Sequence, residues 1–167
     1  MLYPINEREE GKTVETQMTL NSAATSSTRD SQSSLKLVSI SKERKAAEIL
    51  YELLLERGPH ESISHKSMPT LDEHRKFVES NPYQCWYLIK LGDEYVGAVY
   101  ISRQREIGVG VMKAHRQKGV ATAALKMLID KWPGHFLANI NPDNVKSIHL
   151  FSQLGFRHIQ NTYRRDR

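Results

Sequence analysis

The segment 109–125, VGVMKAHRQKGVATAAL, constrains the fold of this chain more than any other. It starts as an apolar strand, passes through a basic turn at 113–118, and reaches Gly119 just before an amphipathic helical pattern. The first turn of a helix has backbone N–H groups without intrahelical partners, and the helix dipole adds partial positive charge there. Because Gly119 has no Cβ, a phosphate can approach the backbone closely. The segment predicts a strand–turn–helix unit that is either an anion site or a solvated basic loop before a core helix.

Hydrophobic periodicity on either side of this unit predicts alternating strands and helices. We expect strands at 35–40, 85–91, 94–102, 106–112, 135–140 and 156–163. We expect helices from a Ser41 cap to about residue 57, at 71–80, at 120–132, and from Asn144 to residue 154. The order β-α-α-β-β-β-α-β-α-β predicts an α/β (α+β) fold, with a mixed central sheet and helices on both faces.

The charge of the chain is concentrated in its predicted domain. The net charge is +5 over 167 residues, whereas residues 1–34 carry −2, so residues 35–167 carry +7. The first 34 residues are rich in Ser and Thr and poor in large apolar residues, which predicts a flexible N-terminal tail followed by one domain at 35–167. A basic domain attracts anionic partners, either a phosphate-bearing ligand or nucleic acid.

Composition excludes several classes of protein. The single cysteine, Cys85, excludes an internal disulfide framework and a cysteine-rich zinc site, and we expect no metal. The chain has no apolar run near the ~20 residues that cross a bilayer, and its N-terminus lacks the pattern of a secretory signal. We therefore expect a soluble, cytoplasmic protein without a membrane partner, either a monomer or a homodimer.

Two motifs resemble those of a known family. Arg116-x-x-Gly119-x-Ala121 is similar to the R/Q-x-x-G-x-G/A motif of the GNAT superfamily of acyl-CoA-dependent N-acetyltransferases. The stretch 141–156, NPDNVKSIHLFSQLGF, resembles the second signature of that family. The resemblance covers about residues 35–163, and it implies a mostly antiparallel sheet whose fourth and fifth strands splay apart.

The resemblance also implies a co-substrate, acetyl-CoA, and the residues that hold it. Backbone groups of Val109 and Val111 would bond the pantetheine arm like an extra strand. Asn144 and Ser147 would lie near the pantetheine or adenosine end, although helix capping is an alternative for both. The turn around the pyrophosphate would consist of Arg116, Gln117, Lys118, Gly119, Val120 and Ala121.

The catalytic groups are less well specified. Glu106 is the candidate general base because it begins the central strand, but it could instead pair with Arg103 or Arg105 at the sheet edge. Many relatives place a tyrosine acid where this chain has Phe151, which cannot donate a proton. His149 and Tyr163 are candidate substitutes, with a helix-surface role as the preferred interpretation of His149.

The acceptor side has candidates in the first half of the domain. His65 lies in a polar loop, whereas His74 occupies an inward helical position that favours a structural role. The alternation of Trp86, Tyr87 and Tyr100 is typical of core residues, with one sheet face available to line an acceptor cleft.

These observations favour an N-acetyltransferase that transfers the acetyl group of acetyl-CoA directly to a primary amine. We expect a small-molecule or sugar-nucleotide acceptor rather than a protein amine. The alternatives are a GNAT-fold protein that binds acyl-CoA without turnover, and a basic nucleic-acid-binding module, which is disfavoured because the basic cluster lies at a cofactor-like turn.

Overall fold

A computed structural model of the chain describes residues 34–58, 67–163 and 165. The predicted tail, apart from Ser34, lies outside the described residues, and so does His65. No helix in these ranges is long and apolar enough to cross a membrane. The same ranges contain no group of three or more His, Cys, Asp or Glu side chains arranged to hold a metal ion.

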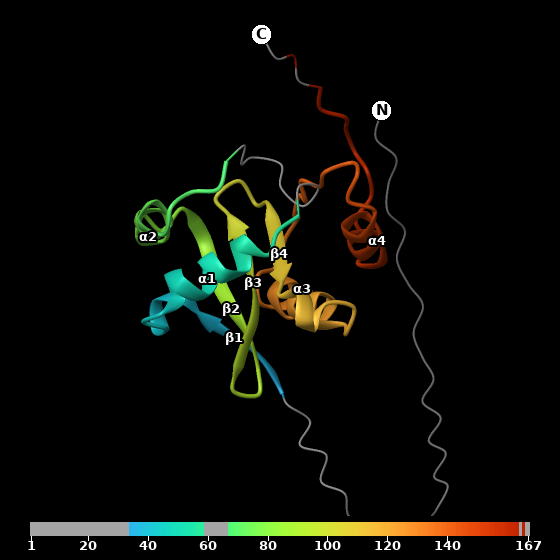
Figure 1. Cartoon of the computed structure of the whole chain (residues 1–167). Helices are drawn as coiled ribbons and strands as arrows, with labels where there is room; N and C mark the ends of the chain where they lie inside the picture. Colours follow the sequence, from blue (N-terminus) through green and yellow to red (C-terminus); the bar gives the residue numbers. More distant parts are fainter. Residues whose placement is uncertain (1–33, 59–66, 164, 166–167) are drawn as a thin grey trace, which may run out of the picture. The chain divides into compact units, whose positions relative to one another are not determined.

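Four strands form one antiparallel sheet in the order β1-β2-β3-β4 (Figure 1). The β2–β3 hairpin turns at Gly92-Asp93, where Gly92 has a positive φ of 61°. The register pairs Leu37 with Ile89 across β1 and β2, and Val99 with Val109 across β3 and β4. The strands are β1 (Leu35–Ser39), β2 (Tyr83–Leu91), β3 (Glu94–Ser102) and β4 (Ile107–Val111).

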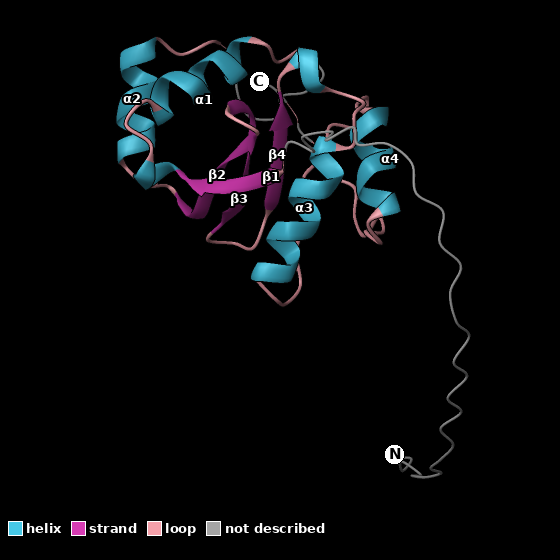
Figure 2. Ribbon diagram, turned by 90° about the horizontal axis from the view of Figure 1, so that it is seen from below, coloured by secondary structure: helices cyan, strands magenta, loops and turns pink. Residues whose placement is uncertain are grey.

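Helices cover both faces of this sheet, as Figure 2 shows: α1 and α2 lie on one side, and α3 and α4 on the other. This arrangement confirms the predicted α/β class with a mostly antiparallel sheet. The helices are α1 (Ala46–Leu55), α2 (Leu71–Glu79), α3 (Val120–Lys131) and α4 (Val145–Gln153), with short 3-10 turns η1 (Ile40–Lys42) and η3 (Lys113–His115).

Each sheet face has its own apolar core because the side chains of a strand alternate between faces. The core beneath α3 and α4 includes Ile89, Val99, Ile101, Leu125, Leu128 and Phe151. The core beneath α1 includes Leu50, Leu53, Trp86, Leu88 and Ala98. In β2 the neighbours Leu88 and Ile89 are both fully buried, one in each core, which places this strand inside the domain.

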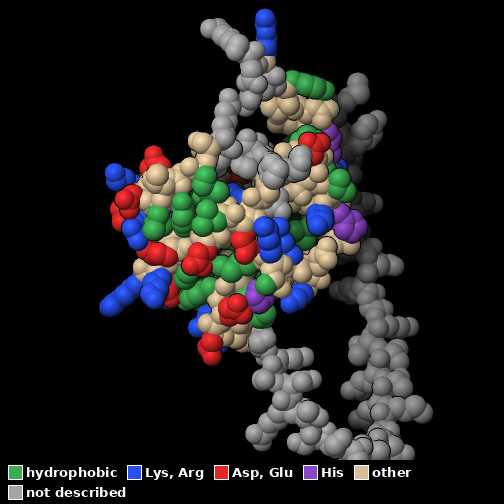
Figure 3. Space-filling model, in the orientation of Figure 1, with side chains coloured by type: hydrophobic (Ala, Val, Ile, Leu, Met, Phe, Trp, Pro, Cys, Tyr) green, Lys and Arg blue, Asp and Glu red, His purple; other side chains and the backbone are tan. Residues whose placement is uncertain are grey.

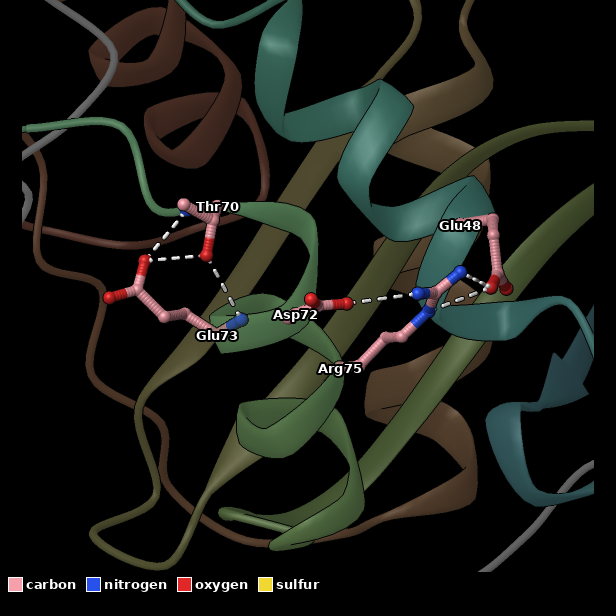
Figure 4. A network of polar contacts seen from close by, with 5 residues as sticks. All are labelled: Glu48, Thr70, Asp72, Glu73 and Arg75. Atoms are coloured by element: carbon pink, nitrogen blue, oxygen red, sulfur yellow. Dashed lines mark hydrogen bonds and ion pairs between the residues drawn. The ribbon is translucent and has the colours of Figure 1, made fainter.

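Polar contacts fix α2 against α1 (Figure 4). Arg75 of α2 donates from Nε and Nη2 to Glu48 Oε1 of α1, at 3.1 and 2.9 Å. Thr70 and Glu73 form a capping box at the start of α2, in which the Thr70 amide donates to Glu73 Oε2 at 2.7 Å. The hydroxyl of Tyr51 donates to the Pro69 carbonyl at 3.0 Å. The two helices therefore form one wall over the sheet.

Three sequence expectations are wrong in detail. Ser41 does not cap the first helix: it lies in η1, its hydroxyl 2.9 Å from that of Ser39, and α1 begins at Ala46. Segment 135–140 forms only an isolated parallel bridge, between Leu137 and Glu106. Segment 156–163 is coil. An apolar run becomes a strand only when a neighbour accepts its backbone bonds, and Leu137 meets β4 only at its start.

We predict that Leu125→Ala lowers the free energy of unfolding by about 2–5 kcal/mol, because the side chain is fully buried and its loss leaves a cavity. Met127→Ala is the matched control on the same helix, because Met127 is 38% exposed and should change the same free energy by less than about 1 kcal/mol. Urea unfolding of both variants measures the difference. Equal losses would contradict the assignment of the inward face of α3.

Candidate functional site

The backbone of β4 has two edges with different partners. Met112 N donates to the Val96 carbonyl of β3 at 2.9 Å, whereas Ile107 N donates to the Leu137 carbonyl on the opposite side at 2.8 Å. Successive residues of an antiparallel strand direct their N–H and C=O groups to alternate edges. The backbone groups of Val109 and Val111 therefore point away from β3, to the edge where segment 135–140 has diverged. This is the geometry that an extended ligand needs in order to pair with β4.

The turn after β4 delivers the chain to the start of α3. Gln117 and Gly119 both have a positive φ, 60° and 76°. A Cβ at Gly119 would meet no other atom within 4 Å, so the space in front of this backbone is open. Gly119 is the N-cap of α3, and Val120 and Ala121 contribute amides from the first helical turn. Gln117 and Lys118 are exposed beside them. The turn thus has the open, positively polarised character of an anion site.

Arg116 has a structural contact within the turn. Its Nε donates to the Val111 carbonyl at 2.8 Å, which ties the end of β4 to the start of α3. The contact also confirms that the Val111 carbonyl faces the outer edge of the strand. The motif predicts a ligand contact for Arg116 but not this bond, which joins its side chain to a backbone group five residues earlier.

Asn144 and Ser147 lie at the start of α4, the helix that lies on the same side of the sheet as α3 (Figure 2). The Asn144 side chain accepts a hydrogen bond from Ser147 N at 3.1 Å, so it caps the helix as the alternative interpretation anticipated. Both residues are half-buried. At the other end of α4, Phe156 N donates to the Phe151 carbonyl after Gly155, which has a φ of 84°.

Glu106 immediately precedes β4. Its Oε1 accepts a hydrogen bond from Asn139 Nδ2 at 2.7 Å, and its amide donates to Ser102 Oγ at 3.1 Å. The two arginines considered as its partners contact backbone carbonyls instead: Arg103 that of Asn81, and Arg105 those of Pro133 and His135. Glu106 therefore keeps its second carboxylate oxygen for other contacts, next to the divergence of β4 and segment 135–140.

A cavity of about 240 Å³ lies between α1, α2 and the sheet. Its aromatic lining comes from Phe77, Tyr83, Trp86 and Tyr100, and its polar lining from Arg57, Glu73 and His74. The prediction that one sheet face lines a cleft identified Trp86 and Tyr100. It missed Arg57, which follows the end of α1, and Tyr83, which is the first residue of β2, because no periodicity extends to these positions. Tyr87 belongs to the opposite core, with Lys131 Nζ 4.9 Å from its ring centroid.

Two tyrosines stack in this cavity, and the same charged residues affect the pKa of both. The rings of Tyr83 and Tyr100 lie 4.2 Å apart with planes at 16°. Burial and the neighbouring Tyr100 raise the pKa of Tyr83 to about 12, and the positive charge of Arg57 opposes the shift. Burial likewise raises the pKa of Tyr100, Arg57 opposes that shift, and the negative charge of Glu106 adds to it. Arg57 and Glu106 thus act on the same pair of phenols.

The other predicted candidates are placed as follows. Phe151 is buried and packs edge-to-face on Phe156, with ring centroids 5.1 Å apart. His149 is exposed on α4, and Tyr163 is 90% exposed. His74 is buried between Tyr51 and Phe77, at 5.5 and 6.4 Å between ring centroids, which agrees with the structural role favoured from the sequence.

Comparisons with known proteins agree on the fold. The sequence model of the acetyltransferase (GNAT) family matches residues 47–156. An acetyltransferase from Thermus thermophilus has a TM-score of 0.61, is 21% identical, and covers 76% of this chain and 89% of its own. YncA from Salmonella typhimurium, whose structure contains acetyl-CoA, has a TM-score of 0.56 and 22% identity over 74% of this chain and 78% of its own. A dodecameric spermidine N-acetyltransferase from Vibrio cholerae has a TM-score of 0.59 and 19% identity, over 78% and 82%. None of the curated proteins matches the chain.

We predict that Tyr83→Phe reduces the loss of stability at high pH. Because the folded-state pKa of Tyr83 lies above the usual value of 10.0, the folded protein holds this proton more tightly than the unfolded chain does. Its stabilisation is complete below about pH 10 and is lost as the pH rises through about 12. Urea unfolding between these pH values should show a smaller fall for Tyr83→Phe than for the parent protein.

The matched control is Tyr163→Phe, because that side chain is 90% exposed. Tyrosinate absorbance of the folded protein checks the same point, since Tyr83→Phe should remove one late-titrating tyrosine of the seven in the chain. An unchanged late phase would contradict the burial of the Tyr83 hydroxyl.

Proposed function

Because the chain belongs to the GNAT acetyltransferase family and is an acetyl-CoA-dependent N-acyltransferase, we propose that it transfers the acetyl group directly to a primary amine of a small molecule or sugar nucleotide. The observation that carries the proposal is the position of β4. The outward backbone groups of Val109 and Val111 and the open turn at Gly119 lie along one side of the strand. The aromatic cavity lies over its α1-facing side, where Gly110 contributes to the lining.

The residues of the turn fit a pyrophosphate. The open space at Gly119, the free first-turn amides of α3 and the exposed Lys118 are three features that favour an anion at one place. The outward groups of Val109 and Val111 fit a pantetheine arm, and Asn144 and Ser147 at the start of α4 would approach its far end. Acetyl-CoA, when bound there, supplies an acyl group activated as a thioester.

Residues of β4 and the preceding Glu106 would deprotonate the amine and polarise the thioester carbonyl. An outward backbone N–H of the 109–111 region would donate to the carbonyl oxygen on which negative charge develops. Glu106, through its second carboxylate oxygen or a water, would accept a proton from the attacking amine, which must be neutral to attack. Phe151 cannot donate a proton, but a thiolate whose conjugate thiol has a pKa of about 8.5 can leave without an acid.

The dimensions of the cavity favour a compact acceptor. A volume of about 240 Å³ holds one ring or one side chain, and α1 and α2 close it on two sides. A small molecule or the sugar end of a sugar nucleotide fits this space. Calorimetry with acetyl-CoA, together with release of free thiol across a panel of amines, tests the proposal. Binding without thiol release from any amine would instead support the second candidate, a binding protein without turnover, which the buried Phe151 favours.

Gly119→Glu should abolish coenzyme A binding, because it places bulk and negative charge at the pyrophosphate position. Gly155→Glu is the matched control: Gly155 also has a positive φ and open space at its Cβ, so it suffers the same backbone strain at the far end of α4. Calorimetric titration of both variants with coenzyme A separates strain from charge. Unchanged affinity in Gly119→Glu would remove this turn from the binding site.

Glu106→Gln should lower the rate of thiol release about a hundredfold near neutral pH and progressively less at higher pH, where the amine loses its proton to solvent. The amide can still contact Asn139, so the fold around it should persist. Glu79→Gln, an exposed carboxylate at the end of α2, serves as the control. A pH–rate profile identical to that of the parent protein would exclude Glu106 as the base.

A further inference from the structure

The cavity over β4 has a mostly apolar lining, with two charged side chains, Arg57 and Glu73, at its wall. Leu53 and Leu54 of α1 face the aromatic group of Phe77, Tyr83, Trp86 and Tyr100. Trp86 contacts both tyrosines edge-on, at 4.8 and 6.5 Å between ring centroids. Aromatic walls of this kind bind the faces of aromatic rings, aliphatic side chains and the apolar faces of sugar rings. Figure 3 shows hydrophobic side chains gathered on the face of the molecule that carries α1 and α2.

The size of the cavity indicates how large a bound apolar group can be. An apolar cavity of roughly 150 Å³ accommodates benzene. The cavity here is about 240 Å³, which is enough for one ring with short substituents. A compact group, such as a single ring or one branched side chain, therefore fits it.

Arg57 supplies the charge. It follows the end of α1, lines the cavity, and no carboxylate in the ranges 34–58 and 67–163 forms an ion pair with it. Glu73 also lines the cavity, but its Oε2 accepts bonds from the Thr70 amide and hydroxyl, at 2.7 and 2.9 Å. Arg57 lies close enough to the stacked tyrosines that its positive charge opposes the rise in pKa that burial causes in both.

The floor of the cavity includes the backbone of β4. Gly110 contributes backbone there, and a Cβ at this position would lie 3.2 Å from Leu53 Cδ2. At Gly108 a Cβ would overlap the ring of Tyr100, so that ring lies directly on the strand. A group held by the aromatic wall would thus lie on the face of β4, next to the outer edge to which the backbone groups of Val109 and Val111 point.

We propose that the acceptor is an amine carried on one compact ring or side chain with an apolar face, that the same molecule bears a carboxylate or a phosphate, and that Arg57 binds this anionic group. The inference rests on the proposed acetyl transfer and names its substrate class. Arg57 is a specificity-determining residue: its guanidinium forms charge-assisted hydrogen bonds to either anion and repels polycationic amines.

Matched amines test the substrate class by release of free thiol from acetyl-CoA. Phenylalanine is compared with phenethylamine, which lacks the carboxylate, and glucosamine 1-phosphate with glucosamine, which lacks the phosphate. Spermidine serves as the polycation. We expect kcat/KM to be at least about tenfold higher for an anion-bearing member than for its neutral partner, and spermidine to be the poorest acceptor. The pair with the larger difference identifies the anion. A preference for spermidine or for both neutral partners overturns the inference and leaves the proposed acetyl transfer intact.

Arg57→Met tests the residue. It should remove the preference, lowering kcat/KM for the anion-bearing amine about tenfold or more and leaving the neutral partner within about twofold. Arg57→Lys should restore part of it, because the charge remains without the planar fork. Arg44→Met is the control, since Arg44 is an exposed arginine before the other end of α1 and does not line the cavity. Equal losses for charged and neutral amines overturn the role of Arg57.

A binding measurement without acetyl-CoA distinguishes acceptor binding in the cavity from acetyl transfer. The chain has two tryptophans, and only Trp86 lines the cavity. The Trp132→Phe substitution leaves Trp86 as the single tryptophan, so the fluorescence reports on the cavity alone. It should cost little stability, because within the described residues the buried Nε1 of Trp132 has no hydrogen-bond partner. Phenylalanine or glucosamine 1-phosphate should change this fluorescence saturably, and Arg57→Met should weaken the effect. Binding without thiol release means that the transfer proposal fails while the pocket chemistry holds. Thiol release from amines that leave the Trp86 fluorescence unchanged means that the pocket chemistry fails.

Discussion

The pairing of β4 is the constraint on which the rest of the molecule depends. One edge of this strand is bonded to β3 along its length, and the two backbones approach so closely that a Cβ at Gly97 would lie only 2.3 Å from the Gly110 carbonyl oxygen. The other edge meets the described chain in one isolated bridge, between Glu106 and Leu137. Beyond that bridge no strand within residues 34–58 and 67–163 pairs with the outward groups of Val109 and Val111, and Arg116 Nε donates to the Val111 carbonyl. The same strand then leads, through the turn held by Arg116, into α3.

Much of this arrangement follows from sequence because it is local. The β2–β3 hairpin and α3 are signalled by periodicities that span a whole element, and the structure forms them within one or two residues of the expected bounds. The segments at 135–140 and 156–163, which we expected to be strands, are short apolar runs whose sequence does not specify which strand they would pair with. Whether such a run becomes a strand depends on a neighbour distant in sequence, and here Leu137 makes a single bridge while Ile159 remains 66% exposed.

The candidate site divides in the same way. The turn around Gly119 is contiguous, so its motif could be recognised, and its left-handed φ explains why a glycine stands there. The cavity is assembled from Leu53, Phe77, Tyr83 and Tyr100, which come from four elements, and from Arg57, which follows α1. Alternation along β2 and β3 indicates a face, but it does not indicate which helix ends lie over that face. The sequence therefore did not indicate that Arg57, which follows α1, lies beside this face of the sheet.

The two proposed anion-binding features would account for part of the basic charge of residues 35–167. Lys118 and the start of α3 belong to the proposed cofactor turn, and Arg57 lines the proposed acceptor cavity. In this account both ligands of the reaction carry negative charge away from the reacting atoms. Binding energy from these remote groups can then orient the amine and the acyl carbon across β4.

The most direct test of this account is an NMR titration of the amide-labelled protein with coenzyme A. The account predicts that the amides of Val109, Val111, Val120 and Ala121 shift together and saturate at one affinity, while those of β1 do not move. Shifts confined to other surfaces, with these four amides unchanged, would contradict the central claim that β4 and the start of α3 form the cofactor site.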